Sequence, residues 1–239
     1  MTTAQQTLKA IVFDLDGTIV DTESTCIAIV KECFERWGLG LAPFDARFII
    51  GRRFEDSFAY LRTKYKIPFS DKRAKDEIFS AYESALKTSL VQAPGIIETL
   101  MDFTGKFQIS LVSGSRRREI EIILNQMGIL SQFDFYLGAE DYARGKPAPD
   151  GYIDAISRMG VEPHETLIFE DSEAGITSAL DSGAWVSAVT WTETADGDPS
   201  RAHFSINDFI GVDSVAIIER VALLGPIPRP RSPGFSGKV

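Results

Sequence analysis

Short apolar runs alternate with longer amphipathic stretches along most of the chain. Five runs predict buried strands, at Leu8–Phe13, Gln108–Ser113, Phe135–Gly138, Thr166–Glu170 and Trp185–Val189, and a weaker run follows at His203–Ile206. Helical spacing of apolar residues predicts helices at Ile96–Phe103, Arg116–Met127, Asp150–Met159 and Glu173–Ser182. Strands that alternate with helices are typical of a parallel sheet covered on both faces. We therefore expect an α/β fold with a Rossmann-like, doubly wound parallel sheet.

One segment, residues 22–90, interrupts this alternation. It contains no convincing strand pattern, and its apolar residues recur at helical spacing, as in Ile27, Val30, Phe34 and Trp37. We predict a helical cap domain here, inserted after the first strand, so that residues 1–21 and 91–225 form the core. Residues 226–239 contain four prolines and few apolar side chains, which predicts a disordered tail.

Composition narrows the class of protein. The chain has 239 residues, 44% of them hydrophobic, which is enough for a packed core and a smaller second domain. Its formal charge of −9 argues against a nucleic-acid partner, because that binding depends on cationic side chains that displace counterions. The N-terminus lacks the apolar core of a signal peptide, and no apolar run approaches the ~20 residues of a membrane span. We expect a cytoplasmic protein without a membrane partner, in which Cys26 and Cys33 are small buried thiols.

Carboxylates follow two of the predicted strands. In "FDLDGT", Asp14 and Asp16 are two residues apart and would lie on one side of an extended segment, before Gly17 allows a sharp turn. In "TLIFED", Glu170 and Asp171 follow another strand. Parallel neighbouring strands would gather these acids at the edge where ligands bind in open α/β sheets. Such a group requires a cation, and oxygen ligands favour Mg2+; the two histidines form no cluster that would indicate zinc.

Two further residues fit a phosphate group. Ser113 ends a predicted strand and carries a hydroxyl that can donate to a phosphate oxygen, and Lys146 in "GKPAPD" supplies a positive charge. Each feature alone has a simpler interpretation: a lone serine there is often a turn residue, and a lone lysine is usually solvated. Glu170 and Asp171 could also cap the next helix. The order of acids, serine, lysine and acids, each near a strand end, carries the functional interpretation.

Four stretches that contain the residues described above resemble motifs of the haloacid dehalogenase-like hydrolase superfamily, in the branch with a helical cap after the first strand. "FDLDGTIVDT", "LVSGS", "GKPAPD" and "FEDSEAG" are similar to its four motifs. The resemblance implies that Asp14 is the nucleophile that forms an aspartyl-phosphate, and that Asp16 is the general acid and base. It further implies that Ser113 and Lys146 bind the transferred phosphoryl group. The resemblance also implies a metal site of Asp14, Asp16, Glu170 and Asp171. Mg2+ would be held by the Asp14 side chain, the Asp16 backbone carbonyl and Asp171, with Glu170 close by.

The "FEDS" form of the last motif resembles the subgroup that acts on sugar phosphates, which contains phosphatases and β-phosphoglucomutase. The mutases carry a cap histidine where this chain has Cys26, so we expect a phosphatase acting on a small phosphate ester, with a phosphosugar mutase as the alternative. A non-catalytic binding module on the same scaffold is a second alternative. Capped relatives are often monomers, which we also expect here. The predicted substrate-binding residues are Thr18, Gly114, Ser115, Arg116, Arg52 and Arg53.

Overall fold

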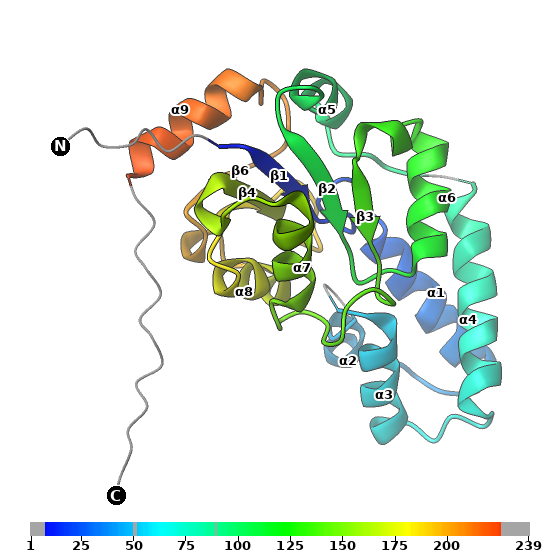
Figure 1. Ribbon diagram of the computed structural model, residues 1–239. Helices are drawn as coiled ribbons and strands as arrows, with labels where there is room; N and C mark the ends of the chain where they lie inside the picture. Colours follow the sequence, from blue (N-terminus) through cyan, green and yellow to red (C-terminus); the bar gives the residue numbers. More distant parts are fainter. Residues whose placement is uncertain (1–7, 50–51, 89, 226–239) are drawn as a thin grey trace, which may run out of the picture.

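A single parallel sheet organises the chain in the computed structural model, which describes residues 8–49, 52–88 and 90–225 (Figure 1). Its strands are β1 (Ala10–Phe13), β2 (Gln108–Val112), β3 (Phe135–Leu137), β4 (Thr166–Glu170), β5 (Trp185–Val189) and β6 (Phe204–Ile206). Their order is β3-β2-β1-β4-β5-β6, and all neighbours run parallel. The chain builds one half of the sheet outward from β1 and then crosses back to β4. The predicted doubly wound α/β sheet is confirmed.

Helices cover both faces of this sheet (Figure 1). Alternate residues of β1 point to opposite faces, so Ile11 and Phe13 join one buried cluster while Ala10 and Val12 join another. The first cluster contains side chains of α5 (Ile96–Phe103), α6 (Arg117–Met127) and α9 (Ser214–Leu224), and the second contains those of α7 (Asp150–Met159) and α8 (Glu173–Asp181). Because both faces are buried, the central strands consist of continuous apolar runs.

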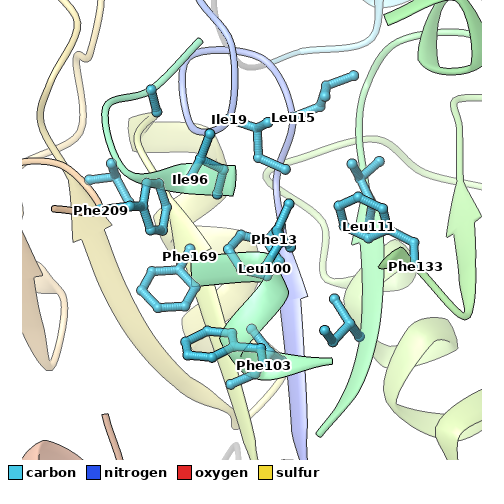
Figure 2. Close-up of a cluster of buried hydrophobic side chains, with 14 of the residues drawn as sticks. Phe13, Leu15, Ile19, Ile96, Leu100, Phe103, Leu111, Phe133, Phe169 and Phe209 are labelled. Carbon is cyan, nitrogen blue, oxygen red and sulfur yellow. The ribbon is translucent and has the colours of Figure 1, made fainter. Parts of the chain in front are cut away.

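Aromatic packing joins the two central strands on the first face. The Phe13 ring on β1 stacks on the Phe169 ring of β4 with centroids 5.1 Å apart, and Phe103, Phe133 and Phe209 surround the pair (Figure 2). The register pairs Phe13 with Phe169, so the next residues, Asp14 and Glu170, lie side by side at the carboxyl ends of the two strands. This apolar layer fixes the positions from which the acidic residues project.

Four helices follow β1, namely α1 (Glu23–Arg36), α2 (Pro43–Arg47), α3 (Phe54–Lys64) and α4 (Asp71–Leu86). They build a third apolar cluster of their own, to which Val30, Phe34, Phe58 and Leu61 belong. In Figure 1 they lie beside the ends toward which the strand arrows point. The helical cap after the first strand is thus observed, while its limits at residues 22 and 90 remain a prediction.

The predicted elements differ from the observed ones mainly at their ends. Ser113 still donates its N–H to the Leu137 carbonyl at 3.0 Å, but the strand ends one residue earlier. Arg116 has an extended backbone and precedes α6 instead of starting it. Helix α9 was not predicted. The proline-rich tail predicted at 226–239 lies outside the described residues. Among the helices that the structure describes, none has both the length and the apolar composition to cross a bilayer.

Candidate active site

The predicted acids gather at the carboxyl ends of β1 and β4, where the sheet changes its direction of growth. The Asp14 N–H donates to the Phe169 carbonyl at 3.0 Å, which continues the strand pairing up to the first acid. Asp14, Glu170 and Asp171 are buried, and each offers a carboxylate oxygen within 4.8 Å of the others. Burial and nearby negative charges oppose ionisation, and the pKa of Asp14 is raised by its burial and by Glu170 and Asp16, despite the opposing effect of Lys146.

Lys146 provides the positive charge of the cluster. Its side chain is 4% exposed, and its ammonium group donates to Asp14 Oδ1 and to Glu170 Oε1. Burial lowers the pKa of Lys146, but the two carboxylates outweigh burial and raise the pKa well above its ordinary value. Lys146 therefore stays protonated beside the predicted nucleophile.

Glu170 uses its oxygens to hold its surroundings in place. Besides Lys146, its Oε1 accepts from the Tyr152 hydroxyl at 2.7 Å. Its Oε2 accepts from the backbone N–H groups of Asp171 and Ser172 at 3.0 and 3.1 Å and from the Ser172 hydroxyl at 3.2 Å. These contacts fix the position of Lys146. The predicted role of Glu170 as a metal ligand stays a prediction, and its contacts favour a positioning role.

Asp171, unlike Glu170, has a carboxylate oxygen without a hydrogen-bond donor among the described residues. Its Oδ1 accepts from the Thr18 hydroxyl at 3.1 Å, but its Oδ2 is buried without a hydrogen-bond partner among the described residues. Gly17 allows this arrangement, because a Cβ there would lie 2.1 Å from Oδ2 and because its φ of +88° favours glycine. Burial, Glu23 and the neighbouring acids raise the pKa of Asp171 well above its ordinary value.

This donor set fits a hard divalent cation. Buried carboxylates without enough positive charge favour a cation bound through oxygen. The Asp171 Oδ2 atom, which has no hydrogen-bond donor among the described residues, and the Asp14 carboxylate beside it can supply two such ligands. The residues therefore fit Mg2+, and the predicted coordination through the Asp16 backbone carbonyl stays a prediction.

Three hydroxyl groups hold the Asp16 carboxylate. Oδ1 accepts from Thr22, while Oδ2 accepts from Ser113 at 2.6 Å and from Ser115 at 2.8 Å. Ser113 is itself fixed, because Tyr142 donates to its carbonyl at 2.7 Å. Asp16 is thus oriented by residues from both sequence motifs that precede Lys146. The predicted phosphoryl contact of Ser113 stays a prediction.

A cavity of about 60 Å3 opens in front of Asp14 and Asp16. Gly114 and Ser115 line it from the core, and Arg52 lines it from the segment before α3. Cys26 also lines it; burial raises the pKa of this thiol, which keeps it protonated. Both cysteines are free. Cys33 is buried away from this cavity, as predicted, whereas Cys26 is only partly buried.

The predicted arginines occupy three different environments. Arg52 lies at the cavity with its guanidinium 4.5 Å from the centre of the Phe48 ring. Arg53 donates to Asp56 at 3.0 Å and to the Ala143 carbonyl at 3.3 Å, in a neighbouring groove.

Arg116 does not line the cavity and contacts other side chains. It donates to Glu119 at 2.7 Å and to Glu83 of α4 at 3.0 Å, and its guanidinium covers the Phe79 ring at 3.4 Å. Its predicted contact with substrate stays a prediction, and these contacts favour a role in joining α4 to α6.

Several residues near the site were not predicted. Thr22 closes the stretch "FDLDGTIVDT", so its contact with Asp16 could have been anticipated from its place in the motif. Tyr142, Tyr152 and Glu119 carry no comparable signal, because their partners lie far away in the sequence or because one buried tyrosine resembles any other.

Acids, a lysine and hydroxyls thus meet at the point where the capped α/β sheet changes its direction of growth. The sequence pattern of the haloacid dehalogenase-like hydrolases matches residues 11–189, and the chain belongs to this family.

Known relatives and solved structures agree with this family assignment. Fructose-1-phosphate phosphatase YqaB of Escherichia coli K12 is 29% identical over 72% of this chain and 92% of its own, and validoxylamine A 7'-phosphate phosphatase of Streptomyces hygroscopicus subsp. limoneus is 28% identical over 79% and 88%. A β-phosphoglucomutase structure from Clostridium difficile shares the fold, with a TM-score of 0.74 and 23% identity over 90% and 97% of the two chains. The predictions of a capped family member and of a phosphoric monoester hydrolase are confirmed.

Proposed function

We propose that this chain is a Mg2+-dependent phosphatase that hydrolyses a small phosphomonoester of the sugar-phosphate type. The observation that carries the proposal is the pair of aspartates, Asp14 and Asp16, that line one cavity. Lys146 donates a hydrogen bond to Asp14, and three hydroxyl groups donate to Asp16. The relatives named as phosphatases of phosphorylated carbohydrates support the substrate class.

The first half of the reaction transfers the phosphoryl group to the enzyme. A carboxylate oxygen of Asp14 attacks phosphorus, the new P–O bond forms, and the bond from phosphorus to the alcohol oxygen breaks. Asp16 in its protonated form gives its proton to that leaving oxygen. The Lys146 ammonium beside Asp14 compensates charge on the group being transferred.

The second half releases phosphate. A water oxygen attacks phosphorus, Asp16 takes the proton of this water, and the bond between phosphorus and Asp14 breaks. Inorganic phosphate leaves, and both aspartates return to their initial states. Mg2+, held by Asp14, Asp171 and the Asp16 backbone carbonyl, would neutralise phosphoryl charge when bound.

A phosphosugar mutase is the alternative that the sequence left open. Position 26 is a cysteine, and Arg116, the candidate for holding a second phosphate, already bonds to Glu83 and Glu119. Both observations favour water over a second sugar hydroxyl as the phosphoryl acceptor. The contact of Lys146 with Asp14 and the contact of Ser113 with Asp16, at one cavity, argue against the non-catalytic alternative.

The test is phosphate release from an aryl phosphate with and without Mg2+. The wild-type chain should require Mg2+, and Asp14→Asn should lower kcat by about 10,000-fold or more, since the nucleophile is lost. Asp154→Asn, on the surface of α7, is the matched control and should keep wild-type activity. Activity of Asp14→Asn near the wild-type level would overturn the proposal.

Adding a hexose bisphosphate to the assay distinguishes a mutase from a phosphatase. It would raise sugar-phosphate isomerisation if the chain were a mutase and should leave phosphate release unchanged in a phosphatase.

A further inference from the structure

The cavity has two chemically different halves. The half next to β1 and β2 is polar and contains Asp14, Asp16, Gly114 and Ser115. Six residues of the segment after β1 line the cavity with hydrocarbon and aromatic surface, beside the polar side chains of Thr22, Glu23 and Arg52. This apolar wall consists of Ile27, Ile49, Phe54, Ile78, Phe79 and Tyr82. The reacting phosphate belongs beside the aspartates, so the alcohol part of a substrate must lie against the apolar wall.

The wall is a continuous surface built by neighbouring elements. Ile78, Phe79 and Tyr82 lie on one side of α4, at spacings that place them on adjacent turns. The Phe54 ring of α3 packs on Phe79 with centroids 4.6 Å apart, and Ile27 of α1 completes the surface. A ring-shaped alcohol would thus meet carbon atoms over one whole face.

Two of the carboxylates that line the cavity, those of Asp16 and Glu119, already accept hydrogen bonds from protein groups. Asp16 accepts from three hydroxyls, and Glu119 accepts from the backbone and side chain of Arg116. Burial raises the pKa of the Tyr82 phenol well above its ordinary value, so this side chain stays neutral. A substrate hydroxyl directed at the carbon atoms of Ile27, Ile78 or Phe79 would lose water without gaining a partner, which is unfavourable. Among the six residues of the wall, only Tyr82 offers a hydroxyl as a partner.

We infer that the preferred substrate is the phosphate of a sugar-like alcohol with one apolar face, such as a deoxygenated or carbocyclic ring, and not a fully hydroxylated hexose. This inference rests on the proposed function, because it concerns the alcohol that the phosphatase releases. Glu23 and Arg52 also line the cavity and can meet polar substituents of such a ring.

The experiment compares two esters of the same shape. Cyclohexylmethyl phosphate and glucose 6-phosphate both join a six-membered ring to phosphate through one CH2 group, and they differ in the hydroxyls and the ring oxygen. We expect kcat/KM for the cyclohexylmethyl ester to be about 100-fold higher, because several hydroxyls would be left without partners. A ratio of one or below, with normal Mg2+-dependent hydrolysis of an aryl phosphate, would overturn the inference and leave the proposed function intact.

A wall variant tests the cause of the preference. Ile27→Asn introduces an amide into the apolar wall and should reduce the kcat/KM ratio of the two esters by about 10-fold, mainly by lowering the value for the cyclohexylmethyl ester. Ile153→Asn is the matched control, since Ile153 is exposed on α7 and does not line the cavity. An unchanged ratio in Ile27→Asn, with the fold retained by circular dichroism, would contradict the role of the wall. If the wild-type chain released no phosphate from any ester, the proposed function would be wrong, and the inference with it.

Discussion

Replacing Arg116 by alanine decides between two roles for this residue. The sequence predicts a substrate contact, whereas the structure gives its guanidinium a contact with Glu83, two contacts with Glu119 at 3.0 and 2.7 Å, and the face of Phe79. Glu119 has a side chain only 4% exposed, and burial raises its pKa while Arg116 opposes that shift. Arg116→Ala would leave this carboxylate buried without its cation.

The size of the effect follows from burial. Removing one partner of a fully buried pair costs about 3–5 kcal/mol. The Arg116 side chain is 27% exposed, so water screens part of the interaction and we expect the free energy of unfolding to fall by about 2–3 kcal/mol. Arg116→Ala combined with Glu119→Gln should recover about 1 kcal/mol of that loss, because an amide is less costly to bury than an unpaired carboxylate.

Urea unfolding followed by tryptophan fluorescence measures this difference. Arg118→Ala is the matched control, because Arg118 pairs with the same Glu83 at 3.0 Å but its side chain is 71% exposed; the expected loss is below about 0.5 kcal/mol. If Arg116→Ala were as stable as Arg118→Ala and instead raised KM at least tenfold, the substrate contact would be the correct interpretation.

Three further predictions concern the acids and a histidine. Glu170→Gln should lower kcat by about 10–100-fold, because Lys146 loses the carboxylate that orients it. Gly17→Ala should raise the Mg2+ concentration needed for half-maximal activity at least about tenfold, since its Cβ would meet Asp171 Oδ2. Burial lowers the pKa of His203 from 6.5, so its stabilising contribution is present above pH 6.5 and is lost as pH falls below it. His203→Asn should flatten the decline in unfolding free energy between pH 7 and pH 5 by about 1 kcal/mol, because the neutral ring accepts a backbone N–H at 3.0 Å.

Each of these has a control. Glu165→Gln alters a carboxylate paired with Lys9 on the surface and should keep wild-type kcat. Gly160→Ala imposes a similar strain, at φ +65°, with open space around the new Cβ, so Mg2+ dependence should not change. His164→Asn replaces the other histidine, which is exposed, and should retain the wild-type pH dependence. A control that behaved like its partner variant would show that the contact assigned to that variant is not the cause.

Strands β4 and β5 have the bounds predicted from the sequence, since both are runs of mainly apolar residues that are buried on both faces of the sheet. Helix α9 was missed because apolar side chains such as Val215 and Leu223 remain exposed on it, which weakens the amphipathic pattern. The gathering of Asp14 and Asp171 was expected on the condition that their strands are parallel neighbours, and the pairing of β1 with β4 meets that condition.

The contacts of the arginines could not be read in the same way. Arg116 and Glu83 are 33 residues apart and meet only because α4 packs beside α6. The apolar wall was equally hidden, since Ile78 and Tyr82 fit the pattern of an ordinary helix core whether they face a cavity or a neighbouring helix. Helical spacing identifies the buried side of a helix but not what lies opposite.

Thr22 is both the residue before α1 and a donor to Asp16. Any rotation of α1 away from the sheet would carry the Thr22 hydroxyl with it and release one oxygen of the acid, while Ser113 and Ser115 keep the other. In the proposed mechanism, the orientation of Asp16 as proton donor would therefore depend on the position of α1, and a molecule with α1 displaced would be a poorer acid catalyst.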